Sequence, residues 1–402
     1  MATLEPATKV LIVGSGLSGV ALAQILRNGN VQFEIFERDD GTRSQGWTIG
    51  LDECLEGLYR LLPTDLPELA SSSPNFHRKD TMDCFTIMDG PSHQILGLTK
   101  TKHEGENLPI LFVNRLKFRE VLKTHLNVQY SKQFVRYEED HDGVTAYFKD
   151  GTSARGHILV GADGSNSPVR AQFLQGFKPD SSPFLTALGR VVLSKDLYEP
   201  LLEHSANGIL AGGPDQKTYC LLMEYLDNDT AIFNWTVSWR SSNLEEDYAK
   251  TVEAGPAAQL EMARQRMKDW PPAMVNALAQ CEPSDLQWPP VRLMETVLPP
   301  RNLPRGRVTL IGDAAHSMVP FRGMGANTAL LDACDLGEGL IKGIQEKEDL
   351  QWVLQLYEQI MIPRGRNKVL ESRATADSDD AREIAGGRID EAQASSHPIP
   401  LR

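Results

Sequence analysis

The sequence has few cysteines, and they form no recognisable motif. The five (Cys54, Cys84, Cys220, Cys281 and Cys334) include no Cys-x-x-Cys pair and no zinc-type spacing among 402 residues. Such patterns mark disulfide scaffolds, zinc sites and dithiol redox centres, so the sequence favours none of these and predicts no metal site. A scattered, odd-numbered set in a chain this long is typical of a reduced, intracellular protein, and we expect a cytoplasmic location.

The sequence also lacks long apolar runs and an excess of positive charge. No stretch approaches the roughly 18 apolar residues that span a bilayer, and Met1–Thr8 has neither the basic nor the apolar part of a signal peptide. The net charge of −13 argues against nucleic acid or an anionic membrane surface as a partner. We therefore expect no transmembrane segment and one large or two medium domains.

A glycine-rich turn lies near the N-terminus. The apolar segment Lys9–Val13 precedes Gly-Ser-Gly-Leu-Ser-Gly at 14–19, and a helical pattern follows to about Asn28. A second apolar segment, Phe33–Phe36, ends at Glu37-Arg38. Strand, Gly-x-Gly-x-x-Gly, helix, strand and acid form the dinucleotide-binding pattern, in which the backbone approaches a pyrophosphate and the acid binds ribose hydroxyls. The sequence therefore predicts a dinucleotide site here.

A second glycine-rich corner occurs late in the chain. An apolar run ends in Gly312-Asp313, and after Pro320 the residues at 323–327 open a helix. Helix N-termini favour anionic ligands, whereas the Asp313 carboxylate suits sugar-type hydroxyls. We expect this corner to make a second contact with a ligand that is held at the N-terminal turn. His316, which follows closely, is expected to form a structural hydrogen bond rather than to act in catalysis.

The segment between these corners has a different character. Four β-like runs are separated by turn residues, helical patterns follow to about 280, and Val291–Glu295 predicts one more strand. The four runs are Phe184–Leu193, Gly208–Ala211, Thr218–Tyr225 and Thr230–Arg240. We predict an α/β protein whose discontinuous Rossmann-like fold contains an inserted antiparallel sheet.

The predicted organisation has four parts. They are a nucleotide-binding part at 1–175, a substrate domain at 176–297, a return to the nucleotide fold at 298–345, and a helical segment with a tail at 346–402. Within the first part, the stretch from 41 to 109 is expected to be irregular, apart from some strands of the second sheet near 80–100.

Three motifs now stand in order along nearly the whole chain: 14–19, Gly-Ala-Asp-Gly-Ser-Asn-Ser-Pro-Val-Arg at 161–170, and Gly312-Asp313 through Asn327. The set resembles the class A, p-hydroxybenzoate hydroxylase-like FAD-dependent monooxygenases, in their salicylate-hydroxylase-like and fungal secondary-metabolism branch. The resemblance implies FAD, NADH or NADPH as co-substrate, O2, and a monomer or homodimer. It implies hydroxylation or epoxidation of an electron-rich aromatic or unsaturated small molecule through a C4a-hydroperoxyflavin, in secondary metabolism or aromatic degradation.

The resemblance also implies the residues that bind the cofactor. They are Gly14, Gly16, Leu17, Ser18 and Gly19 at the pyrophosphate, Glu37 and Arg38 at the adenosine ribose, Arg115 near the FAD, Asp163 and Gly164 near FAD and NAD(P)H, Asp313 at the ribityl chain, and Pro320, Gly323, Met324, Gly325, Ala326 and Asn327 at the isoalloxazine ring. Met324 replaces a residue that is commonly polar in this family.

The substrate-side residues leave alternatives open. In a phenol-dearomatising fungal branch an Arg and a Tyr on the inserted sheet hold a phenolate, which makes Arg190 and Tyr219 catalytic candidates; a structural ion pair and a core tyrosine are equal alternatives. Trp235 and Trp239 alternate onto one face of their strand, either as an aromatic wall for a flat substrate or as the sheet's own core. Burial habits favour the core.

Other functions on this fold also stay open. One is an FAD-dependent reductase or halogenase, and another is a non-redox cyclase that retains FAD. The chain lacks the second nucleotide fold and cysteine pair of disulfide reductases, and the segment 235–239 is not the Trp-x-Trp-x-Ile-Pro motif of halogenases.

Overall fold

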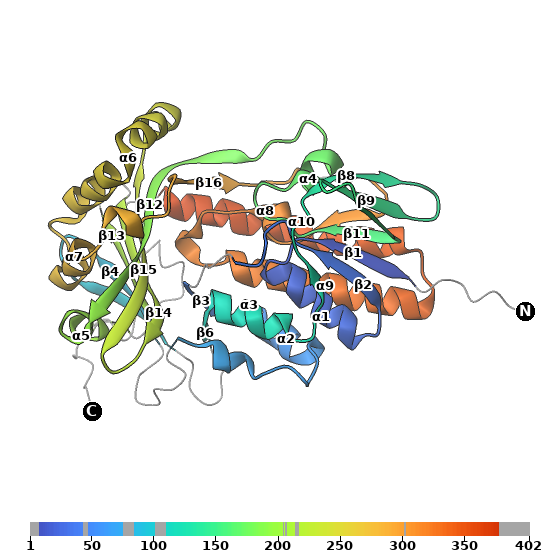
Figure 1. Cartoon of the computed structure of the whole chain (residues 1–402), viewed down its shortest axis with the longest axis horizontal. Helices are drawn as coiled ribbons and strands as arrows, with labels where there is room; N and C mark the ends of the chain where they lie inside the picture. Colours follow the sequence, from blue (N-terminus) through green and yellow to red (C-terminus); the bar gives the residue numbers. More distant parts are fainter. Residues whose placement is uncertain are drawn as a thin grey trace, which may run out of the picture.

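The computed structural model describes residues 8–42, 47–74, 84–100, 110–203, 205, 207–213, 217–300 and 303–377. They form two halves, one around a parallel sheet and one around a larger, mainly antiparallel sheet (Figure 1). The predicted α/β fold class is confirmed.

The first half is built on a five-stranded parallel sheet. Its strands are, in order, β17 (Val308–Leu310), β11 (Ile158–Gly161), β1 (Lys9–Val13), β2 (Gln32–Phe36) and β7 (Val128–Gln129). The central strands read as continuous apolar runs because helices and a smaller sheet cover both faces. Val13, Gly161 and Leu310 lie side by side in register, so the three motifs leave the sheet at one edge.

Helices from both ends of the chain pack on this sheet. α1 (Leu17–Asn28) packs against α9 (Gly325–Glu346), and α10 (Leu350–Ala376) packs along α9. A Cβ on Gly337 would lie 2.6 Å from Ile25, so glycine allows α9 to approach α1 closely. The remaining elements here are α3 (Arg115–Lys123), α4 (Pro168–Phe173), α8 (Asp313–His316), the 3-10 turn η3 (Pro320–Arg322), and a small sheet of β8 (Phe134–Glu139), β9 (Val144–Phe148) and β10 (Ser153–Gly156).

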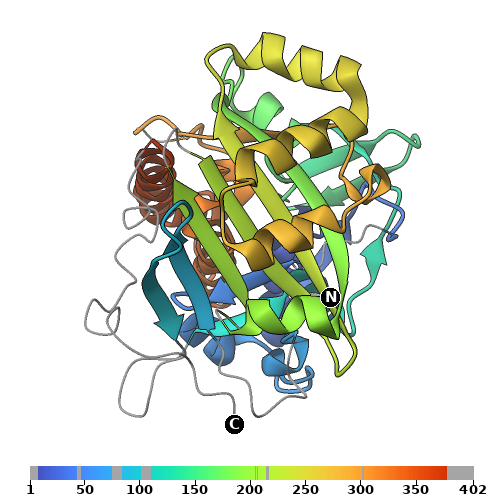
Figure 2. The ribbon, with the colours of Figure 1, turned by 90° about the vertical axis from the view of Figure 1, so that its left-hand side faces the viewer.

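The second half is a seven-stranded sheet covered by helices on one face. Its strands are, in order, β16 (Val291–Glu295), β12 (Asp180–Ser194), β15 (Thr230–Arg240), β14 (Lys217–Leu226), β13 (Gly208–Gly213), β4 (Cys84–Asp89) and β5 (Ile95–Lys100). All neighbours are antiparallel except β13 and β4. Figure 2 shows the covering helices in front of the sheet, with the first half behind it; they include α5 (Lys195–Leu202), α6 (Leu244–Met267) and α7 (Pro272–Ala279).

The structure adds elements in the stretch that was expected to be irregular. β3 (Thr48–Leu51) pairs with β6 (Leu111–Asn114), and α2 (Leu55–Leu61) packs against α9. Both are short, and β3 contains Gly50, so tertiary contacts rather than local propensity stabilise them. η1 (Leu69–Ser72) is a 3-10 turn. The turn residues Pro214-Asp215, between two of the expected β-like runs, and the tail beyond 377 lie outside the described residues.

The cysteines and the helices bear on the disulfides and the membrane spans that the sequence lacks. Cys54, Cys220, Cys281 and Cys334 are free thiols. None of the helices in the part of the chain that the structure describes combines the length and apolar character of a membrane-spanning helix.

Candidate cofactor and substrate site

The glycines of the N-terminal turn divide into two kinds. Gly14 has φ of 109°, and a Cβ there would lie 2.2 Å from the carbonyl oxygen of Ala162. A Cβ on Gly19 would lie 2.1 Å from the carbonyl oxygen of Gly14. A Cβ on Gly16, in contrast, would meet no described atom within 4 Å. Gly14 and Gly19 are therefore required for packing, whereas Gly16 leaves room at the start of α1 for an anionic group to reach the backbone.

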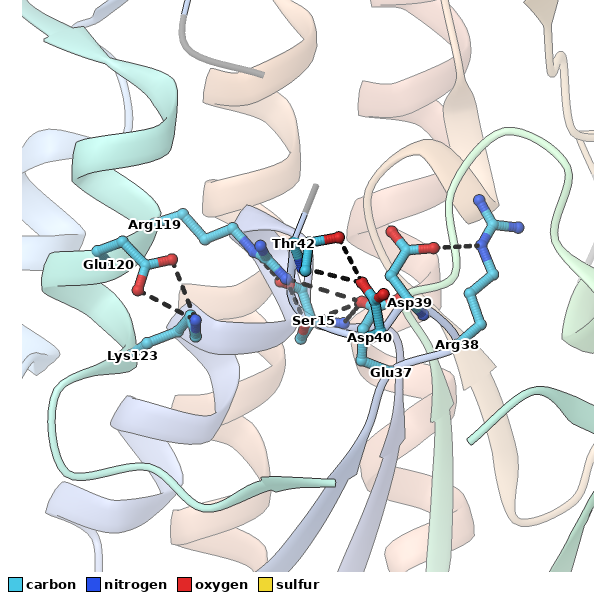
Figure 3. A network of polar contacts seen from close by, with 9 residues as sticks. All are labelled: Ser15, Glu37, Arg38, Asp39, Asp40, Thr42, Arg119, Glu120 and Lys123. Atoms are coloured by element: carbon cyan, nitrogen blue, oxygen red, sulfur yellow. Dashed lines mark hydrogen bonds and ion pairs between the residues drawn. The ribbon is translucent and has the colours of Figure 1, made fainter. Parts of the chain in front are cut away.

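Ser15 and Glu37 form the polar centre of this turn (Figure 3). Glu37 Oε2 accepts hydrogen bonds from the N–H (2.9 Å) and the hydroxyl (2.8 Å) of Ser15, and Oε1 accepts one from the N–H of Asp39 (3.2 Å). Burial alone would raise the pKa of the Glu37 carboxyl, but these hydrogen bonds outweigh it, and the pKa lies below its ordinary value. Glu37 is thus an ionised acceptor, as ribose hydroxyls require.

Arg119 completes this network and was not predicted. Its Nε donates to the carbonyl oxygen of Ser15 (2.7 Å) and its Nη2 to the Ser15 hydroxyl (2.6 Å), and it lies 3.9 Å from Glu37. Arg115, the arginine that was predicted, lies one turn earlier on α3, with its guanidinium over the ring of Trp47 at 5.3 Å. The Arg-x-x-x-Arg spacing on an amphipathic helix is the signal that could have identified Arg119.

An open depression of about 430 Å³ lies at the surface beside Arg38, the residue after Glu37. Arg38, Asp39, Asp40, Thr42 and Ser131 line it. The residues that line it come from the end of β2 and from the segment after β7. In a dinucleotide-binding fold the adenosine lies at this position, beside the acid that binds its ribose. The predicted residue Arg38 therefore lies at this end of the site.

The second motif contributes a carboxyl with unused hydrogen-bonding capacity. Asp163 Oδ2 accepts a hydrogen bond from the N–H of Val169 (3.1 Å), whereas its buried Oδ1 has no hydrogen-bond partner among the described residues. Burial raises the pKa of Asp163. Gly164 has φ of 83°, and a Cβ added to it would meet no described atom within 4 Å. Both residues therefore suit a ligand that approaches this corner.

Arg170 links the second motif to the third. Its Nη2 donates to the carbonyl oxygen of Ser165 (2.5 Å) and its Nη1 to that of Ala314 (2.9 Å). The guanidinium is buried, and burial lowers its pKa. These bonds fix the two corners relative to each other.

The third motif lies against the first. A Cβ on Gly312 would lie 2.8 Å from Ser18 Oγ, so this corner packs on the start of α1. Asp313 is exposed there, as are Pro320 and Gly323, and a Cβ on Gly323 would meet no described atom within 4 Å. The nearest atom to a Cβ on Gly325 would be Met318 Cγ, at 3.9 Å.

The other predicted residues of this loop are less accessible. The side chain of Met324 is buried, that of Ala326 is half-buried, and Asn327 is fully buried. Asn327 Oδ1 accepts a hydrogen bond from the N–H of Asp52 (2.9 Å), and Nδ2 donates to the carbonyl oxygen of Gly50 (2.9 Å). The amide therefore holds β3 beside the start of α9.

His316 is a buried structural residue, as expected. Its Nε2 lies 2.5 Å from Asp332 Oδ2, inside the packing of α8, α9 and α10. The prediction of a structural hydrogen bond is confirmed.

Three of the candidate substrate-side residues lie in the core on the helix-covered face of the large sheet. Tyr219 is buried, and its hydroxyl donates to the carbonyl oxygen of Met274 (2.9 Å) on α7. Trp235 and Trp239 belong to the same core, which the sheet shares with α6 and α7, and Arg266 lies 4.4 Å above the Trp239 ring. Of the alternatives left open by the sequence, the structure therefore shows the core role for Tyr219, Trp235 and Trp239, because their strand positions direct them toward the helices.

Arg190 lies on the opposite face. It pairs across β12 and β15 with Asn234, whereas Tyr219 pairs with Val237, three positions further along β15. Glu224 accepts hydrogen bonds from Arg190 (3.0 and 3.3 Å) and from Asn234 (2.9 Å). The Arg190 side chain is 49% exposed, so this ion pair leaves it accessible.

This face of the sheet looks toward the first half of the molecule. Phe184 contacts Phe321 of η3 at 5.2 Å between ring centroids, and Asn114 donates to the carbonyl oxygen of Glu224 (3.0 Å). The half-buried side chains that lie between these contacts are those of Leu188, Cys220, Leu222, Asn234 and Thr236. They form a mostly uncharged wall opposite the third motif.

The residues at the shared edge fit FAD. A Cβ on any of four glycines would meet no described atom closer than 3.9 Å, Asp163 has a buried oxygen without a hydrogen-bond partner among the described residues, and an open depression begins at Arg38, next to Glu37. The four glycines are Gly16, Gly164, Gly323 and Gly325. Together they offer backbone and hydroxyl-binding groups along an extended path, as a dinucleotide requires.

Comparison with known proteins decides the family. Residues 107–372 match the FAD binding domain family. The chain belongs to this family. An FAD-dependent monooxygenase of Trichoderma harzianum, thnD, is 30% identical, covering 92% of this chain and 93% of that protein. The FAD-dependent monooxygenase phnB of Penicillium herquei is 28% identical, covering 91% and 89%.

Several solved structures share the fold. HpxO of Klebsiella pneumoniae, complexed with FAD and uric acid, has a TM-score of 0.71 at 22% identity, covering 96% of this chain and 92% of that one. The 2,6-dihydroxypyridine-3-hydroxylase of Arthrobacter nicotinovorans has a TM-score of 0.72 at 20% identity, covering 96% and 94%. At such identities these likenesses show the fold alone. The family and its fungal relatives confirm the predicted class of FAD-dependent monooxygenase and do not favour the reductase, halogenase and cyclase alternatives.

Proposed function

We propose that this monooxygenase uses NADH or NADPH and O2 to hydroxylate or epoxidise an electron-rich aromatic or unsaturated small molecule. The observation that carries the proposal is the mostly uncharged wall of the large sheet, on the face that contacts the first half through Phe184 and Phe321, two residues before Gly323 of the third motif. Such a wall suits a flat apolar substrate. The fungal relatives, named as FAD-dependent monooxygenases, support the same chemistry.

The chain's own residues would hold the cofactor. We propose that Glu37 binds the adenosine ribose, that the N–H groups at the start of α1 bind the pyrophosphate, and that Asp313 binds the ribityl hydroxyls. The start of α9, at Gly325, would direct its helix dipole at the ring and favour negative charge there by roughly 1–2 kcal/mol. Bound FAD supplies the redox chemistry and the reaction with O2, which no side chain provides.

We propose Arg190 as the substrate-side catalytic residue. A guanidinium favours the ionised form of a bound phenol and makes its ring more nucleophilic. Glu224 holds this guanidinium in place through the hydrogen bonds given above, and Asn234 in turn donates a hydrogen bond to Glu224. Tyr219 has no part in this proposal because its hydroxyl is bound on the other face of the sheet.

The test is an assay of the FAD-loaded protein. NADH and NADPH oxidation and O2 consumption are measured with and without a panel of phenols and other electron-rich aromatics, and labelled O2 is traced into product by mass spectrometry. Substrate-stimulated oxidation with label in the product is expected. Absence of stimulation across the panel, or product without label, would count against the proposal.

Arg190→Ala tests the substrate-side role. It should leave the flavin spectrum intact and abolish product. Arg266→Ala is the matched control, because this arginine lies over Trp239 on the helix-covered face. Retained turnover in Arg190→Ala would reject its role.

A further inference from the structure

A buried carboxylate lies behind the Gly-Asp corner of the third motif. Asp332, on α9, is fully buried, and its Oδ2 accepts a hydrogen bond from the N–H of Gly312 (2.8 Å) and lies 2.5 Å from Nε2 of His316. Its Oδ1 accepts a hydrogen bond from Nη2 of Arg364 (2.9 Å), on α10. One carboxylate therefore joins the corner to two helices.

The corner needs such support because its backbone is unusual. Gly312 has φ of 61°, and only four helical residues follow it in α8. The N–H of Gly312 is bound by Asp332, and its carbonyl oxygen accepts hydrogen bonds from the N–H groups of Ala315 (2.8 Å) and His316 (2.9 Å). Both polar groups of Gly312 are thus fixed, and the direction of the next residue, Asp313, follows from them.

His316, which contacts Asp332, is itself held in place by α10. A Cβ on Gly365 would lie 2.5 Å from the imidazole ring, so α10 packs directly on it. Burial alone would lower the pKa of His316, but the adjacent Asp332 carboxylate outweighs burial and raises it. The imidazole and the Asp332 carboxylate therefore stabilise each other inside the protein.

We propose that Asp332 is a positioning residue for FAD, acting through Gly312 and His316 to hold Asp313 where it contacts the ribityl chain. This inference rests on the contact between Asp313 and FAD that is proposed above. Asp332 itself touches neither cofactor nor substrate, because it is enclosed by α8, α9 and α10.

The chain offers a matched control in Asp335. Asp335 accepts a hydrogen bond from the other terminal nitrogen of Arg364 (2.6 Å). Asp332→Asn and Asp335→Asn each remove one carboxylate partner of Arg364, but only Asp332 binds Gly312 and His316. The dissociation constant of FAD is measured by quenching of flavin fluorescence on the apoprotein, and unfolding of each apoprotein is followed in parallel.

Asp332→Asn should raise the dissociation constant of FAD roughly tenfold or more, and Asp335→Asn by less than about twofold. Asp313→Asn should weaken FAD binding to a similar degree. The double variant Asp332→Asn/Asp313→Asn should bind FAD about as weakly as Asp313→Asn alone, because the two residues act in series. A residue that supported only the stability of the protein would give additive effects instead.

Several outcomes would overturn the inference. They are an FAD dissociation constant within about twofold of wild type in Asp332→Asn, equal losses in Asp332→Asn and Asp335→Asn, and additive losses in the double variant. Unchanged binding in Asp313→Asn would remove the proposed ribityl contact and the inference with it, while leaving the monooxygenase assay unaffected.

A second variant covers the case in which Asp332→Asn does not fold. His316→Asn removes one bond of Asp332 and should weaken FAD binding roughly threefold or more. Unchanged FAD binding in folded His316→Asn would reject the inference equally.

Discussion

Arg119 donates two hydrogen bonds to Ser15, one to its carbonyl oxygen (2.7 Å) and one to its hydroxyl (2.6 Å). Ser15 lies between Gly14 and Gly16 of the N-terminal turn, and its N–H and hydroxyl donate hydrogen bonds to Glu37. A cation on α3 therefore supports a backbone turn that lies 104 residues earlier in the chain. The turn and the ribose-binding acid are held as one unit (Figure 3).

Arg119→Met should weaken FAD binding about tenfold or more, because the turn loses two charge-assisted hydrogen bonds. Lys123→Met is the matched control: it removes the same charge one turn further along α3, where Lys123 binds Glu120 at the surface. Fluorescence titration of both apoproteins with FAD measures the difference. Equal FAD affinities in the two variants would contradict the supporting role of Arg119.

Two glycine substitutions separate packing from ligand binding. Gly14→Ala should destabilise the apoprotein by about 2–4 kcal/mol, since its Cβ would overlap Ala162 and its φ is positive. Gly16→Ala should leave apoprotein stability within about 0.5–1 kcal/mol and lower FAD affinity, since its Cβ would point into open space. Urea unfolding and FAD titration give the two quantities. A Gly16→Ala protein with normal FAD affinity would show that the backbone at this position does not approach the cofactor.

Tyr219→Phe should lower stability without abolishing turnover. The variant loses the hydrogen bond to Met274, which is worth about 1 kcal/mol. Stability is measured by urea unfolding, and product formation is measured with the substrate that the panel identifies. A folded Tyr219→Phe enzyme without product would return this residue to the catalytic candidates.

Glu358 makes stability depend on pH. Burial against β17 raises the pKa of Glu358 from near 4.5 to about 7, although Thr309 donates a hydrogen bond to it (2.9 Å). The folded state therefore binds this proton more tightly than the unfolded state does. The stabilisation is complete below about pH 4.5, is lost as the pH rises to about 7, and does not change further above that.

Glu358→Gln should remove this dependence. At about pH 8 it should be more stable than wild type by on the order of 2–3 kcal/mol, and at about pH 4.5 the two should be similar. Urea unfolding at both pH values measures this, with the exposed Glu199→Gln as control. A constant difference between wild type and Glu358→Gln at both pH values would contradict the raised pKa.

Local patterns in the sequence predicted most of the strands and all three motifs. β1 and β16 begin and end where expected, because turn or loop residues bound these short runs. Arg119 and Asp332 were not predicted as parts of the site, because their partners Ser15 and Gly312 lie on other elements. Their contacts depend on how α3 and α9 pack, which no local pattern contains.

The two faces of the large sheet show a second limit. Alternation predicts that Trp235 and Trp239 share a face, but it does not tell which face the helices cover. Whether the side chains of Arg190 and Tyr219 lie on the same face of the sheet depends on strand register, since a shift of one residue moves a side chain to the other face. Only the pairing of both with β15 places them on opposite sides.

The pairing of β17 with β11 has a consequence for how the protein is made. Val308 lies beside Leu159, so the central sheet is completed only after the whole second sheet has been synthesised. Long-range parallel pairing folds slowly because distant segments must meet before any contact compensates the loss of chain entropy. During translation β11 therefore has an unpaired edge until β17 is made. The FAD contacts proposed for Asp313 and the glycine loop follow β17 in the chain, so they form only after the second sheet has been synthesised.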